Sequence, residues 1–238
     1  MKRGRANNLL SLCAGTLLIA LFIVPVFPAQ AAPPVFTECT GAQEAEAVEA
    51  LQNARAMVAD SAAYLAGVAD AQRVYDAPYA TWFGAYDGWR YRKVLANFGA
   101  IGSALDRESL SISCTCGTHA LGDAYTLGPK KSYAISLCSN FWAAPLRGGK
   151  SRAGEIVEAM SRLDAVVGAK VKAPTQIESM TLASEKPAEA IQSASNYRYF
   201  AEEEKTAGTE HLLPAVMLIL LLLLGERLRR RRGRSLGR

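Results

Sequence analysis

The sequence predicts an α+β domain that is mostly helical and carries a small antiparallel sheet. Apolar residues recur at three- and four-residue spacing in residues 43–69, 85–105 and 154–163, which is typical of amphipathic helices. Two short stretches, 110–113 and 133–137, instead alternate apolar and small polar residues, which is typical of half-buried strands. With 238 residues, the chain is long enough for one domain of ordinary size beside its terminal segments.

The first two helices should face the core with one apolar stripe each, and a turn at Asp76, Pro78 and Gly84 should separate them. The expected core-facing residues are Val48, Leu51, Val58, Ala62 and Leu65 in the first helix, and Trp89, Val94, Phe98 and Ile101 in the second. Core packing is also the expected role of the aromatic cluster formed by Trp82, Phe83, Tyr86 and Trp89.

The third helix is short and central to the interpretation of the chain. Ser151 is suited to cap its N-terminus, and Gly168 follows it in a turn. Its apolar face is expected to contain Ile156, Val157, Met160 and Leu163.

The remaining segments have weaker signals. Residues 128–131 lie between Tyr125 and Tyr133 and indicate a hairpin turn. The basic, glycine-containing loop 147–152 is expected to be a solvated linker, with anion binding as the alternative. Residues 176–195 have a helical pattern, in which Pro187 suits a first-turn position.

The basic character of the chain is confined to its two ends. Residues 1–31 contain three basic residues and no acids, and residues 211–238 contain seven Arg and one Glu. Residues 32–210 have 17 basic and 21 acidic residues, a net charge of −4. This distribution gives little support to nucleic-acid binding by the globular part, so no nucleic-acid partner is expected.

The N-terminal segment, residues 1–31, has the pattern of a secretory signal peptide. Lys2, Arg3 and Arg5 precede an apolar run, and Ala29 and Ala31 frame a small-x-small cleavage site. An uncleaved anchor is the alternative. The expected globular domain then spans residues 32–204.

The C-terminal part divides into a polar linker (205–211), an apolar segment (212–225) and a basic tail (226–238). The thirteen apolar residues 212–224 would form a helix of roughly 20 Å, short of the roughly 30 Å hydrocarbon core. We expect the segment to anchor the domain in a membrane, with the Arg-rich tail in the cytoplasm and the domain outside. The alternative is a bacterial sorting helix that is removed, which would leave the protein secreted or at the surface.

Four cysteines remain after the signal segment: Cys39, Cys114, Cys116 and Cys138. An even number in an exported protein predicts two disulfides. Three pairings exist, and the one that joins Cys114 to Cys116 is least favoured because its ring would be very tight. A zinc knuckle is disfavoured, because Cys-x-Cys has no partners nearby at ligand spacing.

Several segments, in this order, resemble the lysine-specific metalloendopeptidase and deuterolysin family of zinc peptidases. They are residues 79–84 (YATWFG), 114–116 (CTC), 137–145 (LCSNFWAAP), 154–168 and 196–202 (NYRYFAE). The resemblance implies a zincin-like metallopeptidase fold, and it favours the pairs Cys39–Cys114 and Cys116–Cys138.

The residues that carry the family's chemistry are replaced. The His-Glu-x-x-His motif supplies two zinc ligands and a general base from one helix face, and its positions hold Glu158, Ala159 and Arg162. The aspartate ligand falls on Val171, and a transition-state tyrosine falls on Pro174. The acidic pair that receives a substrate lysine falls on Ser195 and Arg198.

The resemblance therefore implies a catalytically degenerate homologue that acts by binding and holds no cofactor, where the family would bind one zinc. A protein or peptide in the former cleft, between the third helix and residues 196–202, is the expected partner. The alternatives are an active zinc endopeptidase with a non-standard metal site, and a structural or inhibitory partner of an active relative.

Few other groups are available for chemistry. The two histidines, His119 and His211, have no second ligand at helical spacing. Asp123, Asp164, Glu155 and Glu158 are scattered carboxylates, for which a solvated surface is the expected setting. We further expect Glu158 and Arg162 to form an i,i+4 ion pair at the former zinc position.

Overall fold

The computed structural model describes residues 34–107, 109–116 and 124–203, which belong to one compact unit. The expected signal peptide, the apolar segment 212–225 and the basic tail lie outside these residues. Among the residues that are described, no helix is long and apolar enough to cross a membrane.

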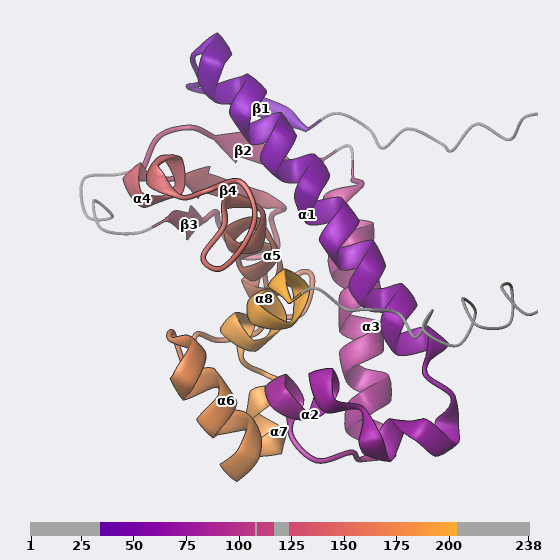
Figure 1. The fold of residues 1–238 in the computed structure, drawn as a ribbon. Coiled ribbons are helices and arrows are strands. Elements are labelled where there is room, and N and C mark those ends of the chain that lie inside the picture. The colour runs from indigo at the N-terminus through magenta and orange to yellow at the C-terminus, as the bar shows by residue number, and fades with distance from the viewer. Residues whose placement is uncertain (1–33, 108, 117–123, 204–238) are drawn as a thin grey trace, which may run out of the picture. The chain divides into compact units, whose positions relative to one another are not determined.

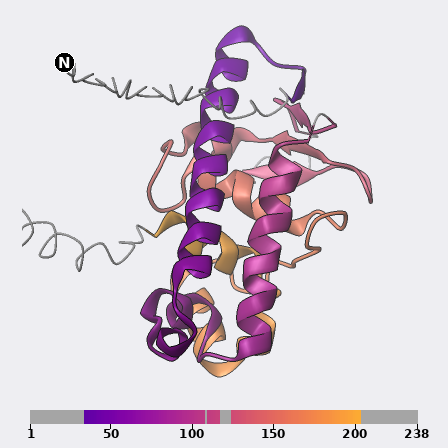
Figure 2. The same cartoon turned by 90° about the vertical axis from the view of Figure 1, so that its right-hand side faces the viewer.

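Two long helices, α1 (Gly41–Gly67) and α3 (Gly88–Leu105), lie side by side (Figures 1 and 2). Thr40 caps α1 in a capping box with Gln43, in which each side chain accepts from the other residue's backbone N–H. Asp87 caps α3 by accepting from the N–H groups of Trp89 and Arg90. Both helices were predicted, and the capping residues Thr40 and Asp87 fix where each helix begins.

The predicted turn at residues 76–84 is wrong, because this segment forms helix α2 (Ala77–Phe83) after the 3-10 helix η1 (Asp70–Tyr75). Asp76 caps α2 by accepting from the Tyr79 N–H, and Pro78 occupies the first turn, where a proline needs no N–H partner. Asp76 and Pro78 therefore start a short helix here. Gly84 ends it.

Most of the predicted core residues of α1 and α3 are buried, but Val48 and Ala62 of α1 are only partly buried. Val94, Phe98 and Ile101 are fully buried, whereas the predicted core residue Trp89 is 61% exposed. Trp89 lies in the first turn of α3. At about 3.6 residues per turn, Trp89 lies on the side of α3 opposite Val94, Phe98 and Ile101, which explains why its side chain is exposed.

Gly84 can be replaced only at a cost in stability. Its φ is +80° and its ψ is −176°, a region that essentially only glycine occupies, and a Cβ would collide with the Ala183 carbonyl and with Pro187. We expect Gly84→Ala to lower the free energy of unfolding by about 2–4 kcal/mol, as measured by urea unfolding of the full chain. The control is Gly99→Ala on α3, where a Cβ meets nothing within 4 Å and should stabilise the protein by about 0.5–1 kcal/mol. Equal stabilities for the two variants would contradict the backbone argument.

The sheet is mixed and not antiparallel as predicted. Its strands are β1 (Val35–Thr37), β2 (Ser111–Ser113), β3 (Tyr125–Leu127) and β4 (Ala134–Leu137), in the order β1-β2-β4-β3. The predicted hairpin is present as the antiparallel pair β3–β4. The pairs β1–β2 and β2–β4 are parallel, because long connections, α1 to α3 in the first case, return the chain to the same end of the sheet.

Two disulfides join residues at one edge of the sheet. Cys39 pairs with Cys114 and Cys116 pairs with Cys138, as the family resemblance implied. Cys39, Cys114 and Cys138 each follow a parallel strand, β1, β2 and β4 respectively. Because parallel strands end at the same edge, the cysteines come within bonding distance there.

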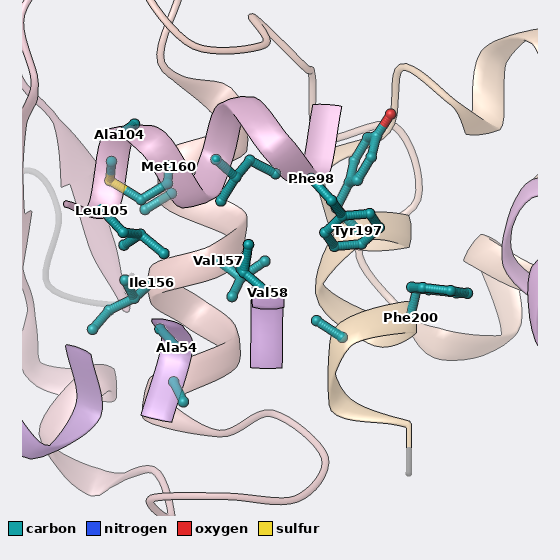
Figure 3. Close-up of a cluster of buried hydrophobic side chains, with 14 of the residues drawn as sticks. Ala54, Val58, Phe98, Ala104, Leu105, Ile156, Val157, Met160, Tyr197 and Phe200 are labelled. Atoms are coloured by element: carbon teal, nitrogen blue, oxygen red, sulfur yellow. The ribbon is translucent and has the colours of Figure 1, made fainter. Parts of the chain in front are cut away.

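Helix α5 (Arg152–Arg162) follows the short α4 (Ser139–Ala143) and packs against α4, α1, α3 and the C-terminal helix. Ser151 caps α5 by accepting from the Gly154 N–H, as predicted. Figure 3 shows that its apolar side chains Ile156, Val157 and Met160 meet side chains of α1, α3 and the C-terminal helix. The labelled partners are Ala54, Val58, Phe98, Ala104, Leu105, Tyr197 and Phe200.

The predicted helix 176–195 is divided in the structure. It consists of α6 (Gln176–Glu185) and α7 (Pro187–Ala190), and a separate helix, α8 (Ala194–Glu202), follows. Pro187 begins α7, where its missing N–H is no loss. A parallel bridge between Lys170 and Ser193 fixes the point at which the chain turns into α8, which packs against α5 (Figure 1).

Candidate functional site

Helices α5 and α8 approach closely and bring together positions that the family resemblance predicted to be altered. Gly154 permits the approach, because a Cβ there would collide with the carboxylate of Glu202 and touch Arg198. The Glu202 carboxylate accepts from the backbone N–H and the hydroxyl of Ser151, at 2.9 and 3.0 Å. An acidic side chain from α8 thus binds the positive end of α5. Glu158 and Arg198 lie further along this interface.

Arg198 is buried between two carboxylates of α5. Its Nη1 lies 2.8 Å from Oε1 of Glu155 and 2.9 Å from Oε2 of Glu158, and its side chain is 6% exposed. The aligned hydrogen bond from Nη1 goes to Glu155, whereas Oε2 of Glu158 has no aligned donor and is held by charge. Nη2 of Arg198 donates to the carbonyl of Pro174 at 3.4 Å. Both terminal nitrogens of this guanidinium therefore already interact with groups of the same chain.

The expected ion pair between Glu158 and Arg162 is wrong. Among the described residues, no carboxylate oxygen lies within 4.0 Å of an Arg162 nitrogen. The hydroxyl of Tyr125 lies between the two residues, donating to Oε1 of Glu158 at 3.0 Å and accepting from Nη1 of Arg162 at 3.0 Å. The i,i+4 rule assumes an exposed pair, but Glu158 is buried and its carboxylate is bound by Arg198 from another helix.

Burial and mutual contact set the charges in this cluster. Burial disfavours the Arg198 cation, but Glu158 and Glu155 outweigh burial and raise the pKa of Arg198 above its usual value. Burial first, and then the Glu158 carboxylate, raise the pKa of Tyr125, so that its hydroxyl stays protonated and can donate. Burial also raises the pKa of Glu155 to about 7, although Arg198 opposes that rise.

The raised pKa of Glu155 predicts a loss of stability between pH 5 and pH 8. A folded-state pKa of about 7 exceeds the ordinary value, so the folded chain keeps a proton that the unfolded chain has released. The free energy of unfolding then falls as the pH rises through this window, and burial of Glu202, whose pKa is also raised, acts in the same direction. At pH 8 we expect Glu155→Gln to be more stable than the wild type by about 1–3 kcal/mol, with little difference at pH 5.

Urea unfolding at both pH values measures this effect. Glu49→Gln is the matched control, because Glu49 is exposed on α1 and its change should leave the pH dependence as it is. If the free energy of unfolding of Glu155→Gln depends on pH as steeply as that of the wild type, Glu155 is not the group responsible.

The other altered positions are scattered around this cluster. Ala159 is buried in the core and Ser195 is fully buried, with no hydrogen-bond partner for its hydroxyl. Val171 is 41% exposed. Pro174 contributes its carbonyl, which accepts from Arg198 and, at 2.9 Å, from the hydroxyl of Tyr199. Of these positions, Glu158 is joined to Arg198 by an ion pair and Arg198 to Pro174 by a hydrogen bond.

The sequence reasoning missed Tyr125 and Glu155. Glu155 and Glu158 were expected to be solvated, but their side chains are only 12% and 7% exposed. Asp164 is exposed as expected, and Asp123 and the two histidines lie outside the described residues. One signal was available: two carboxylates three residues apart share a helix face and repel each other, which calls for a cation nearby.

Comparison with known proteins identifies the family of this chain. A family model for the lysine-specific metallo-endopeptidase matches residues 68–202. The chain belongs to the lysine-specific metallo-endopeptidase family. It is 36% identical over 165 residues to an extracellular protease of Aeromonas hydrophila, covering 69% of this chain and 45% of that protein.

One further relative and one solved structure agree with this family. The chain is 30% identical over 170 residues to the peptidyl-Lys metalloendopeptidase of Pleurotus ostreatus, covering 70% of this chain and 95% of the relative. The solved zinc peptidase from Grifola frondosa superposes with a TM-score of 0.63 at 31% identity, covering 69% of this chain and 96% of that structure. The chain spans about half the length of the Aeromonas protein and of two other curated relatives.

The residues that the family resemblance predicted at the ligand positions, Glu158, Arg162 and Val171, do not fit a zinc ion. A catalytic zinc takes three nitrogen, sulfur or oxygen ligands and keeps one open position. Here one carboxylate oxygen of Glu158 lies against the Arg198 cation and the other accepts from Tyr125, while Val171 offers no donor atom. Among the described residues, no group of three His, Cys, Asp or Glu is arranged to hold a metal ion.

Proposed function

We propose that this protein is a non-catalytic member of the lysine-specific metallo-endopeptidase family that acts by binding a protein or peptide. The observation that carries the proposal is the ion pair between Arg198 and Glu158, at 2.9 Å. The family resemblance puts Glu158 at a zinc-ligand position. In this chain the Arg198 cation lies against its carboxylate, where the metal ion would bind. A metal ion would have to displace a buried guanidinium, which would leave Arg198 without its full charge compensation.

The same contacts argue against recognition of a substrate lysine. The resemblance places the family's acidic lysine-binding pair at Ser195 and Arg198, one a buried hydroxyl and the other a cation. Glu155 and Glu158 carry negative charge nearby, but both contact Arg198. A lysine would therefore meet neutralised carboxylates and a like charge.

Export is part of the proposal. The pattern of residues 1–31 and the apolar segment 212–225 support a domain displayed outside the cytoplasm, either anchored in a membrane or released after removal of the tail. The extracellular protease of Aeromonas hydrophila is a relative whose name agrees with this location.

A cleavage assay tests the proposal. The full chain, supplied with zinc, is incubated with peptides that contain one internal lysine, and the products are separated by mass spectrometry, with the Grifola frondosa enzyme as the positive control. We expect no cleavage beyond that of a blank without protein. Cleavage on either side of the lysine, abolished by Glu158→Gln, would establish instead an active zinc endopeptidase with a non-standard metal site.

A further inference from the structure

A pocket of about 190 Å³ lies beside the altered metal positions. One wall comes from β3 and the β3–β4 turn, and the other from the end of α5 and the segment after it. The residues that matter for its chemistry are Leu127, Lys130, Arg162, Leu163, Asp164 and Lys170. Three cationic side chains and one carboxylate thus line the pocket, together with the apolar Leu127 and Leu163. The volume is below the roughly 300–1,000 Å³ of sites for drug-sized ligands, so it suits a single side chain or a small acid.

Arg162 is held in place without being neutralised. Its Nη1 donates to the Tyr125 hydroxyl at 3.0 Å, and its guanidinium lies 5.3 Å from the centre of that ring. Neither contact removes its charge, and none of the carboxylates that the structure describes lies within 4.0 Å of it. Arg198, in contrast, is paired with two carboxylates. A fixed guanidinium with uncommitted N–H groups is well suited to bind a planar carboxylate.

The single carboxylate in the lining does not neutralise the basic residues of the pocket. Asp164 is the acid of the lining, and its Oδ1 lies 3.8 Å from Nζ of Lys170, with both side chains largely exposed. Such a loose surface pair contributes little. Lys130 is exposed on the opposite wall. A carboxylate in the pocket would therefore meet the fixed Arg162 and the exposed Lys130 and Lys170.

We propose that this pocket binds a carboxylate group of a peptide, from an Asp or Glu side chain or from a free C-terminus. The inference rests on the proposed function and deepens it. The pocket borders Arg162 and Val171, and the inference specifies which chemical group of the bound peptide is recognised there. It also reverses the preference implied by the family resemblance, from a cationic to an anionic residue.

The test measures the binding of short peptides to the full chain in mild detergent by ligand-detected NMR titration. The probe is acetyl-Ala-Leu-Glu-Leu-amide, compared with its Gln counterpart and with acetyl-Ala-Leu-Ala-Leu that has a free C-terminus. We expect the Glu peptide to bind at least tenfold more tightly than the Gln peptide. Raising the salt concentration should reduce that ratio. If the peptide with the free C-terminus is preferred instead, the carboxylate comes from the chain end.

Variants locate the site. Arg162→Gln should weaken binding of the preferred peptide at least tenfold, and Lys170→Gln, at an exposed position that does not affect folding, about two- to threefold. Arg92→Gln is the control of equal charge, since Arg92 is exposed on α3, outside the pocket. Equal affinity for all three peptides, no binding of any, or affinities indifferent to both pocket variants would overturn the inference.

The two proposals fail in different ways. Loss of the carboxylate preference in a chain that still does not cleave lysine peptides overturns the pocket assignment and leaves the non-catalytic function. Cleavage of lysine peptides by a chain that prefers the Glu peptide overturns the proposed function and leaves the pocket.

Discussion

Arg198→Met is expected to lower the free energy of unfolding by about 3–5 kcal/mol at pH 8, because it leaves two buried carboxylates without a cation. Glu155 and Glu158 both lie within 3 Å of Arg198 Nη1 in the wild type, and Met has a similar apolar stem. Without the cation that opposes it, the raised pKa of Glu155 rises further, so that the folded chain holds this proton more tightly than the unfolded chain. The destabilisation should therefore be larger at pH 8 than at pH 5.

Two further variants make this prediction specific. Arg92→Met removes an exposed arginine from α3 and should change stability by less than about 0.5 kcal/mol. Adding Glu158→Gln to Arg198→Met should restore about 1–3 kcal/mol, because it removes one of the stranded charges. Urea unfolding of the full chain measures all of them. If Arg198→Met lowers the free energy of unfolding by less than about 1 kcal/mol at pH 8, the ion pairs contribute no more than exposed ones do. That result would contradict the buried cluster.

Removal of the disulfide Cys39–Cys114 is the second change with a large expected effect. The bridge spans 75 residues of sequence, against 22 for Cys116–Cys138. In the chain-entropy model, closing these loops restricts the unfolded chain by about 4–5 and about 3 kcal/mol respectively. The pair Cys39→Ala and Cys114→Ala should therefore destabilise the protein more than the pair Cys116→Ala and Cys138→Ala.

Thermal and urea unfolding of the two double variants, compared with the wild type under oxidising conditions, measure the difference. The two double variants are matched to each other, because each removes one bridge between a buried and a partly buried cysteine at the same end of the parallel strands. If the short-loop variant lost more stability, local packing around Cys138 would outweigh loop closure.

The helices were predictable because their signals are local. The period of apolar residues placed Ile156, Val157 and Met160 in the core, and Ser151 marked the start of α5. The direction of the strands was not predictable in the same way. β1 has three residues and no periodic signal, and its parallel partner lies beyond two long helices.

The site was only half visible in the sequence. The family motifs located Glu158 and Arg198 as altered positions, but local spacing favoured Arg162 as the partner of Glu158. The true partner is on α8, and the intervening Tyr125 comes from β3. Contacts between side chains of three separate elements depend on how those elements pack, and a pairing rule for one helix cannot supply that information.

The most direct test of the account is the zinc content of the purified full chain, measured by elemental analysis after equilibration with zinc and removal of the unbound metal. The account predicts far less than one zinc per chain, because Arg198 and Tyr125 occupy the carboxylate of Glu158. One zinc per chain that is lost on Glu158→Gln would contradict it.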